Sequence, residues 1–126
     1  MRGVMIVVLT TLVILVAGIA SILYLEKTAE ELGDLLLATQ DAVLIEDWAQ
    51  AEERFNACLA RWENVQRTWS ALINHQEVDE IQMTFERAKE YVGNQEKASA
   101  LAELAVAKLL VEHVPQKEKP SWANIL

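Results

Sequence analysis

The longest apolar run in the chain lies near its N-terminus and predicts a helix that crosses a membrane. Residues Val4 to Leu25 contain no charged side chain. As an α-helix this run would be roughly 33 Å long, which is enough to cross a hydrocarbon core of ~30 Å. Tyr24, near its far end, suits the membrane–water interface. The sequence therefore predicts a transmembrane anchor in residues 1–25 that contacts the lipid bilayer through Val4 to Leu25.

A cleaved signal peptide is the alternative interpretation of the same run. Gly18 and Ala20 provide small residues at the −3 and −1 positions of a cleavage site after Ala20. Apolar residues continue from Ile22 to Leu25, past that site, so the run is longer than the apolar region of a usual signal peptide. We expect a retained anchor, and cleavage stays open as the alternative.

The charges that flank the run predict its orientation. Arg2 and the N-terminal amine precede it, whereas Lys27 follows it among the acidic residues Glu26, Glu30 and Glu31. Because positively charged flanks stay on the cytoplasmic side, we expect a cytoplasmic N-terminus. The remainder of the chain is then an extracytoplasmic domain attached to the cell membrane by a single pass.

Beyond the anchor, apolar residues recur every three or four positions, which predicts helices throughout. The first segment continues the anchor helix through one such stripe: Leu25, Ala29, Leu32, Leu36, Thr39 and Val43. The clearest stripe in the chain follows, with the heptad spacing of a helix packed along one seam: Trp48, Ala51, Phe55, Cys58, Trp62, Val65, Trp69 and Leu72. Three tryptophans on one stripe could form a ligand box, but large rings in a small domain favour a core.

Two further helical segments complete the chain. The third carries a shorter heptad stripe: Val78, Ile81, Phe85, Ala88 and Val92. The fourth, from about residue 95 to 113, has apolar residues around most of its circumference: Ala98, Leu101, Ala102, Leu104, Ala105, Leu109 and Leu110. A helix this apolar is predicted to be the most buried of the four. We expect Pro115 to end it.

Helix caps mark the connections between these segments. Asp47 with Gln50, and Asn74 with Glu77, have the spacing of capping boxes at the second and third helices. Gly93 is expected at the position after the third helix where a left-handed residue is favoured.

Short connections imply antiparallel neighbours, so the predicted fold is all-α. We expect an up-down bundle of about four helical segments in residues 26–114, followed by a tail in residues 115–126. The predicted core of this bundle consists of Trp48, Phe55, Cys58, Trp62, Val65, Ile81, Phe85, Leu101 and Leu104.

The charge balance excludes a nucleic-acid partner. From Glu26 onward the chain has ten Lys or Arg against nineteen Asp or Glu, a formal charge of −9. Binding to nucleic acid or to anionic lipid headgroups requires clustered positive charge instead. The sequence has no phosphate-binding loop, nucleophile elbow or zinc-protease motif. We therefore expect neither enzymatic activity nor a cofactor.

Cysteine and histidine often act in catalysis or metal binding, and the chain has three of them: Cys58, His75 and His113. Cys58 falls on the apolar stripe of the second helix, so we interpret it as a small core residue, with a reactive or chain-linking thiol as the alternative. The two histidines are expected at the same end of the bundle, where a zinc or pH-sensing site is conceivable. Their spacing matches no metal motif, and a histidine near a helix C-terminus commonly complements the helix dipole.

Several segments resemble one family of proteins. They are the apolar start after Met-Arg-Gly, the Trp62 and Trp69 pair, and the stretches YLEKTAEEL, EDWAQAEERF, INHQEVDEI and VEHVPQKEK. The chain is similar over nearly its whole length to short membrane-anchored bacterial proteins, mostly from Gram-positive spore-formers, known only as a domain of unknown function. The resemblance implies no catalytic residue. It implies a membrane partner, because such proteins often accompany a family of multi-pass membrane proteins.

We therefore expect an interaction module, an accessory subunit that packs on a multi-pass membrane protein or on itself. An extracytoplasmic ligand or pH sensor acting through a partner is the alternative. The second helix is longer than the first segment outside the membrane, so its last turns should reach the headgroups. The tail should return to the same end. The candidate interaction residues are Trp69, Leu72, Ile73, Trp122, Ile125 and Leu126.

Overall fold

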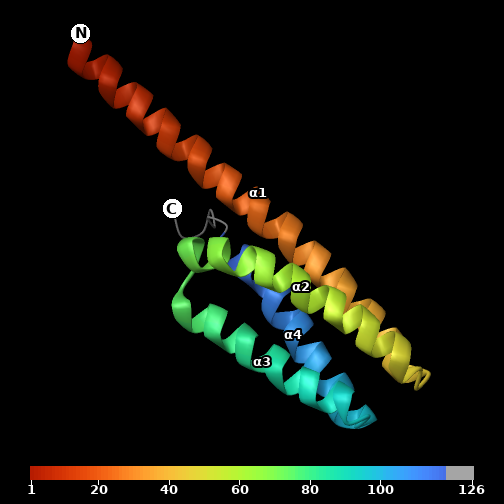
Figure 1. Ribbon diagram of the computed structural model, residues 1–126. Coiled ribbons are helices and arrows are strands. Elements are labelled where there is room, and N and C mark those ends of the chain that lie inside the picture. Colours follow the sequence, from red (N-terminus) through yellow and green to blue (C-terminus); the bar gives the residue numbers. More distant parts are fainter. Residues whose placement is uncertain (119–126) are drawn as a thin grey trace.

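The computed structural model describes residues 1–118, which form an antiparallel bundle of four helices (Figure 1). They are α1 (Arg2–Leu44), α2 (Trp48–Leu72), α3 (His75–Gly93) and α4 (Lys97–Glu118). Helix α1 packs against α2 and α4, and α3 packs against the same two helices. The described residues contain no strand. The predicted all-α bundle is confirmed.

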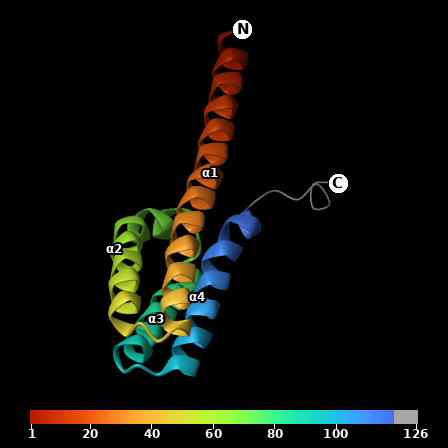
Figure 2. The same ribbon diagram turned by 90° about the vertical axis from the view of Figure 1, so that its right-hand side faces the viewer.

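Helix α1 continues without a break from the exposed N-terminal part of the chain into the bundle (Figure 2). Residues 2–20, here called the exposed segment, are solvent-accessible throughout. Burial begins after Ala20, and Leu25 is only 1% exposed. Leu25, predicted to contact lipid, therefore lies in the bundle core. Among the described helices, α1 is the one long and apolar enough to cross a membrane, and a signal sequence would meet the same criteria.

The stripe on α2 lines the centre of the bundle. Six of its eight residues are buried, and Trp48 and Leu72 at its two ends are half-buried. The Trp62 ring contacts the Trp69 and Phe85 rings edge to face, with centroids 5.6 and 5.4 Å apart. Both indoles also have polar partners, as buried tryptophans usually do. The Nε1 of Trp62 donates to Gln82 Oε1 at 2.7 Å, and that of Trp69 donates to Thr28 Oγ1 at 2.8 Å.

Helix α4 differs from its prediction in two respects. It runs past Pro115 to Glu118, so the proline does not end it. A proline this close to a helix end costs one backbone hydrogen bond, and the buried Pro115 ring packs against the bundle. Helix α4 is also not buried on all sides. Its buried residues form a single stripe that ends at Pro115: Ala100, Leu104, Ala107, Val111 and Val114. Leu101, predicted as core, is half-buried.

The turns after α1 and α3 share one backbone geometry. Glu46 and Gln95 both have a φ of 57°, and each is the second residue after its helix. The Gln95 and Glu96 amides donate to the carbonyls of Val92 and Tyr91, the hydrogen-bond pattern of a Schellman motif. The turn after α1 has the same pair of hydrogen bonds. Gly93, predicted at the left-handed position, is instead the last residue of α3.

Asp47 and Asn74 cap α2 and α3 as predicted, but the reciprocal hydrogen bond of a capping box is present at neither cap: the Asp47 amide donates to the carbonyl of Ala42. Asp47 Oδ1 accepts from the Gln50 amide at 3.2 Å. Asn74 Oδ1 accepts from the Gln76 amide at 2.9 Å. Glu77, predicted to return a hydrogen bond to the cap, instead pairs with Lys117 Nζ at 3.0 Å. The side chain of Glu77 therefore joins α3 to α4.

The Trp62→Ala variant tests the central position of this ring. We expect it to lower the free energy of unfolding by about 3–5 kcal/mol, because it leaves a cavity and removes two ring contacts. The matched variant Trp48→Ala, at a half-buried ring, should lower it clearly less. Urea unfolding of the full chain in mild detergent, followed by near-UV circular dichroism, measures both. Equal losses in the two variants would contradict a core centred on Trp62.

The Gln95→Gly variant tests the left-handed turn. Glycine adopts a φ of 57° without the steric cost that glutamine has there, so we expect stabilisation by about 0.5–1 kcal/mol after the larger chain entropy of unfolded glycine is included. The control Lys89→Gly, at an exposed position inside α3, should instead destabilise by about 1 kcal/mol. The same urea titration reports both changes. A Gln95→Gly variant less stable than the native chain would show that the turn does not have this geometry.

Candidate functional site

The predicted interaction residues on α2 are not an exposed surface. Trp69 is 0% exposed, and its indole hydrogen bond to Thr28 fixes it between α2 and α1. Ile73 is 9% exposed and Leu72 is half-buried. The rest of the predicted set lies outside the described residues: Trp122, Ile125 and Leu126. On α2, the prediction therefore identified core residues, because the 3-4 stripe that places Trp69 on the seam also turns it inward.

The end of the bundle at which α1 enters it is here called the entry end. It is formed by the α2–α3 turn and the C-terminal part of α4 (Figure 2). The Glu77–Lys117 ion pair joins α3 to α4 there. Beside it lies a cavity of about 30 Å³, lined in part by Glu77, His113 and Lys117. Glu77 Oε2 is buried and accepts no hydrogen bond from the described residues. The cavity is large enough for one water molecule that could satisfy this oxygen.

Both histidines are exposed at the entry end, and they do not line the same cavity. His75 is the first residue of α3 and is exposed. His113 lies in α4 and lines the small cavity, and His75 is not among the residues that line it. Because α4 continues for five residues beyond His113, this histidine is not at the helix C-terminus as predicted. Within residues 1–118, no group of three His, Cys, Asp or Glu side chains is placed to hold a metal ion.

A second, wider groove separates α1 from α4 at the entry end. Its volume is about 380 Å³, and it is open to solvent. Glu26, Glu30 and Glu112 line it, together with Pro115 and Gln116. An open groove with three carboxylates is well hydrated, so it offers no enclosed apolar space for a small ligand.

Cys58 is a core residue rather than a reactive one. Its side chain is 0% exposed on the inward face of α2. Burial raises the pKa of its thiol to about 12, because the thiolate would lose its hydration. The thiolate is the reactive form of cysteine, so Cys58 is protected from oxidation and from cross-linking in the folded chain.

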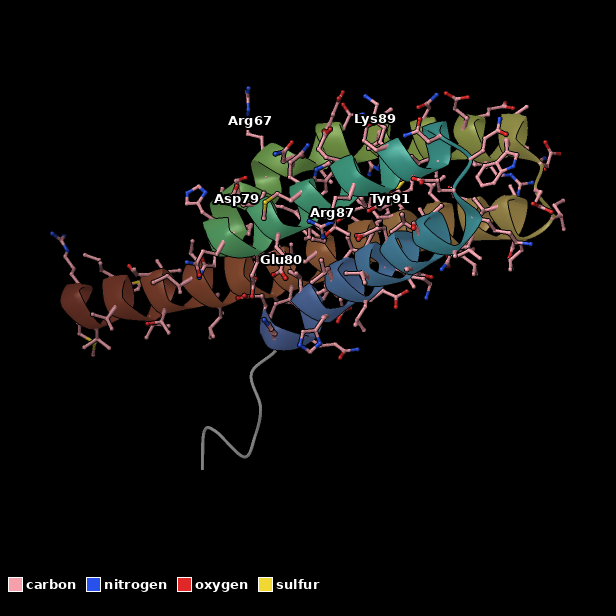
Figure 3. The ribbon with its side chains drawn as sticks, turned by 90° about the horizontal axis from the view of Figure 1, so that it is seen from below. Arg67, Asp79, Glu80, Arg87, Lys89 and Tyr91 are labelled. Atoms are coloured by element: carbon pink, nitrogen blue, oxygen red, sulfur yellow. The ribbon has the colours of Figure 1, made fainter. Side chains whose placement is uncertain are left out.

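Charged side chains cover the outside of α2 and α3. Arg67 projects from α2 away from the bundle, whereas Arg87 reaches from α3 toward α4 (Figure 3). The Arg87 Nε lies 3.2 Å from Glu103 Oε1. This ion pair turns the one carboxylate in the middle of α4 toward α3. The opposite side of α4 therefore carries no carboxylate at this level of the helix.

The apolar face of α4 that points away from the bundle is the surface that the sequence analysis missed. We call it the outer face of α4, and it consists of Ala98, Ala102, Ala105, Val106 and Leu109. All five residues are exposed, Leu109 by 66%. Several of them were predicted as buried because α4 is apolar on two sides. The spacing of its apolar residues alone does not tell which side faces the bundle.

The fold defines the class of this protein as a single antiparallel helical bundle whose first helix extends beyond it as an exposed apolar segment. The chain belongs to the family described as "Domain of unknown function (DUF4363)", whose model matches residues 19–125. The match confirms the resemblance to a family of unknown function that the sequence indicated. It covers all of the bundle and only the last two residues of the exposed segment. No curated protein and no solved structure gives a significant match.

Proposed function

We propose that the protein is a membrane-anchored, extracytoplasmic interaction module, an accessory subunit of a membrane protein assembly. The observation that carries this proposal is the continuity of α1 (Arg2–Leu44), which joins the exposed segment to the bundle without a linker. The first half of this helix is apolar on all sides, which suits contact with lipid. The second half is apolar on one side only, which suits packing in a protein core.

The dimensions and polar groups of the exposed segment support a membrane location. Its 19 residues span about 28 Å as a helix, close to the hydrocarbon thickness of a bilayer. Within the segment, the Thr10 hydroxyl donates to the carbonyl of Ile6 at 2.7 Å, and Ser21, the first residue after it, donates to the carbonyl of Ala17 at 2.8 Å. These hydroxyls therefore need no water, which favours burial in lipid. Arg2, the first residue of the segment, supports a cytoplasmic N-terminus.

An interaction role fits the surface better than a sensory or catalytic role. A pH or ligand sensor is favoured by one feature, the small cavity beside His113 and the buried Glu77 oxygen. That cavity accommodates a single water, and the larger groove is open to solvent. The outer face of α4 is, by contrast, an apolar surface on an otherwise acidic domain, as is common where proteins meet.

The test is the mass of the assembly that the protein forms in its native membrane. We expect the full chain, extracted in mild detergent, to appear by native mass spectrometry in a complex heavier than one chain. The control replaces the exposed segment with a cleavable secretion signal, and its near-UV circular dichroism verifies that the bundle is folded. It should be a monomer, because the tether no longer concentrates and orients the module. A monomeric full chain, or an unchanged complex without the segment, would rule out the proposal.

A further inference from the structure

Helix α4 (Lys97–Glu118) is apolar on two opposite sides, although a bundle requires only one. The buried stripe runs through Ala100, Leu104 and Ala107, and the outer face runs two residues behind it. Two residues correspond to about 200° around a helix, so the two stripes point in opposite directions. Val106 is 43% exposed and Leu109 is 66% exposed on the outer side. This apolar surface therefore stabilises nothing within a single bundle.

Lipid does not account for the outer face. The membrane, in the proposed arrangement, lies beyond the entry end, where α4 finishes at Glu118. Leu109 is nine residues before that end, or about 14 Å along the helix, and Ala98 is about 30 Å from it. The outer face therefore lies in the aqueous space along its whole length, and a protein surface is the partner that can cover it.

The charges around the bundle favour a second copy at this face. The domain carries a formal charge of −9, so two copies repel each other at most approaches. Exposed carboxylates occur on α1 at Glu30 and Asp34 and on α2 at Glu52 and Glu53. The outer face of α4 has none between Ala98 and Leu109, and the carboxylate of Glu112, one turn further along, is paired with Lys108 at 2.8 Å. Two chains can meet there without bringing carboxylates together.

The tether also dictates how two copies can meet. Chains anchored in one bilayer with the same orientation can pair their α4 helices only in parallel, about a two-fold axis along the membrane normal. The residues Ala98, Ala102, Ala105 and Leu109 have the 4-3-4 spacing that a parallel two-helix seam requires. The alanines on this seam would allow close approach of the two backbones.

We propose that the outer face of α4 pairs with the same face of a second copy in a parallel homodimer. A stable complex in solution usually buries about 800 Å² on each partner, which is more than one short helical seam provides. The pairing therefore requires the membrane tether, which raises the effective concentration and sets the orientation. In this sense the inference rests on the proposed function.

Oxidative cross-linking of single cysteines tests the parallel pairing. Full chains with Ala105→Cys, or with the exposed control Ala60→Cys on α2, are reconstituted in phosphatidylcholine vesicles and oxidised with copper phenanthroline. Cys58 is buried and provides no competing thiol. The same residue of two copies meets across a parallel seam, so Ala105→Cys should give about tenfold more disulfide-linked dimer than Ala60→Cys. Equal yields would overturn the pairing.

A second substitution checks that the seam causes the cross-link. Leu109→Glu in the Ala105→Cys chain should abolish it, because the new carboxylates of two copies repel each other. Leu44→Glu, at a leucine that is 53% exposed at the other end of the bundle, should leave it unchanged. A cross-link that survives Leu109→Glu would also overturn the pairing.

The native complex distinguishes the two proposals. If the pairing fails and the native complex contains a different protein, the interaction module stands without the homodimer. If the native chain is a monomer, both proposals fail.

Discussion

The unbroken helix α1 is the constraint on which the rest of the structure depends. It contributes an exposed apolar segment on one side and one of the four helices of the bundle on the other, with no break in the helix between them. The bundle is joined to α1 by the Trp69–Thr28 hydrogen bond and by the Arg61–Glu31 ion pair, whose Nε and Oε2 atoms are 2.7 Å apart. The bundle therefore cannot rotate independently of the segment that precedes it.

This rigid connection gives each part of the bundle a fixed place relative to a membrane. The entry end, with its open acidic groove and its small cavity, would lie next to the headgroups. The outer face of α4 would stand perpendicular to the bilayer, where a neighbour in the same membrane can reach it. A flexible linker would permit many encounter geometries, whereas a continuous helix permits few, and this lowers the entropy lost when two anchored proteins associate.

The fold was predictable from the sequence where one periodic pattern dominated. On α2, a single stripe with polar residues opposite left one way to place Trp62 and Trp69. The pattern failed on α4, because Leu104 and Leu109 belong to opposite apolar sides and no local signal says which one the bundle covers. It also failed at Pro115, whose ring is buried against the bundle within α4, and at Gly93, which is exposed and ends α3 while Gln95 takes the left-handed position. The missed surface was visible only after α1 and α3 had been placed beside α4.

Compartment-specific labelling tests the central claim that α1 crosses the membrane intact. Single cysteines replace Gly3, in the exposed segment, and Asn64, on the outside of α2, and Cys58 stays buried and unreactive. A membrane-impermeant maleimide is added to cells before and after permeabilisation. We predict that Asn64→Cys is labelled in intact cells and that Gly3→Cys is labelled only after permeabilisation. A mature chain that has lost the Gly3→Cys site, or an Asn64→Cys site protected in intact cells, would contradict a retained anchor with an external bundle.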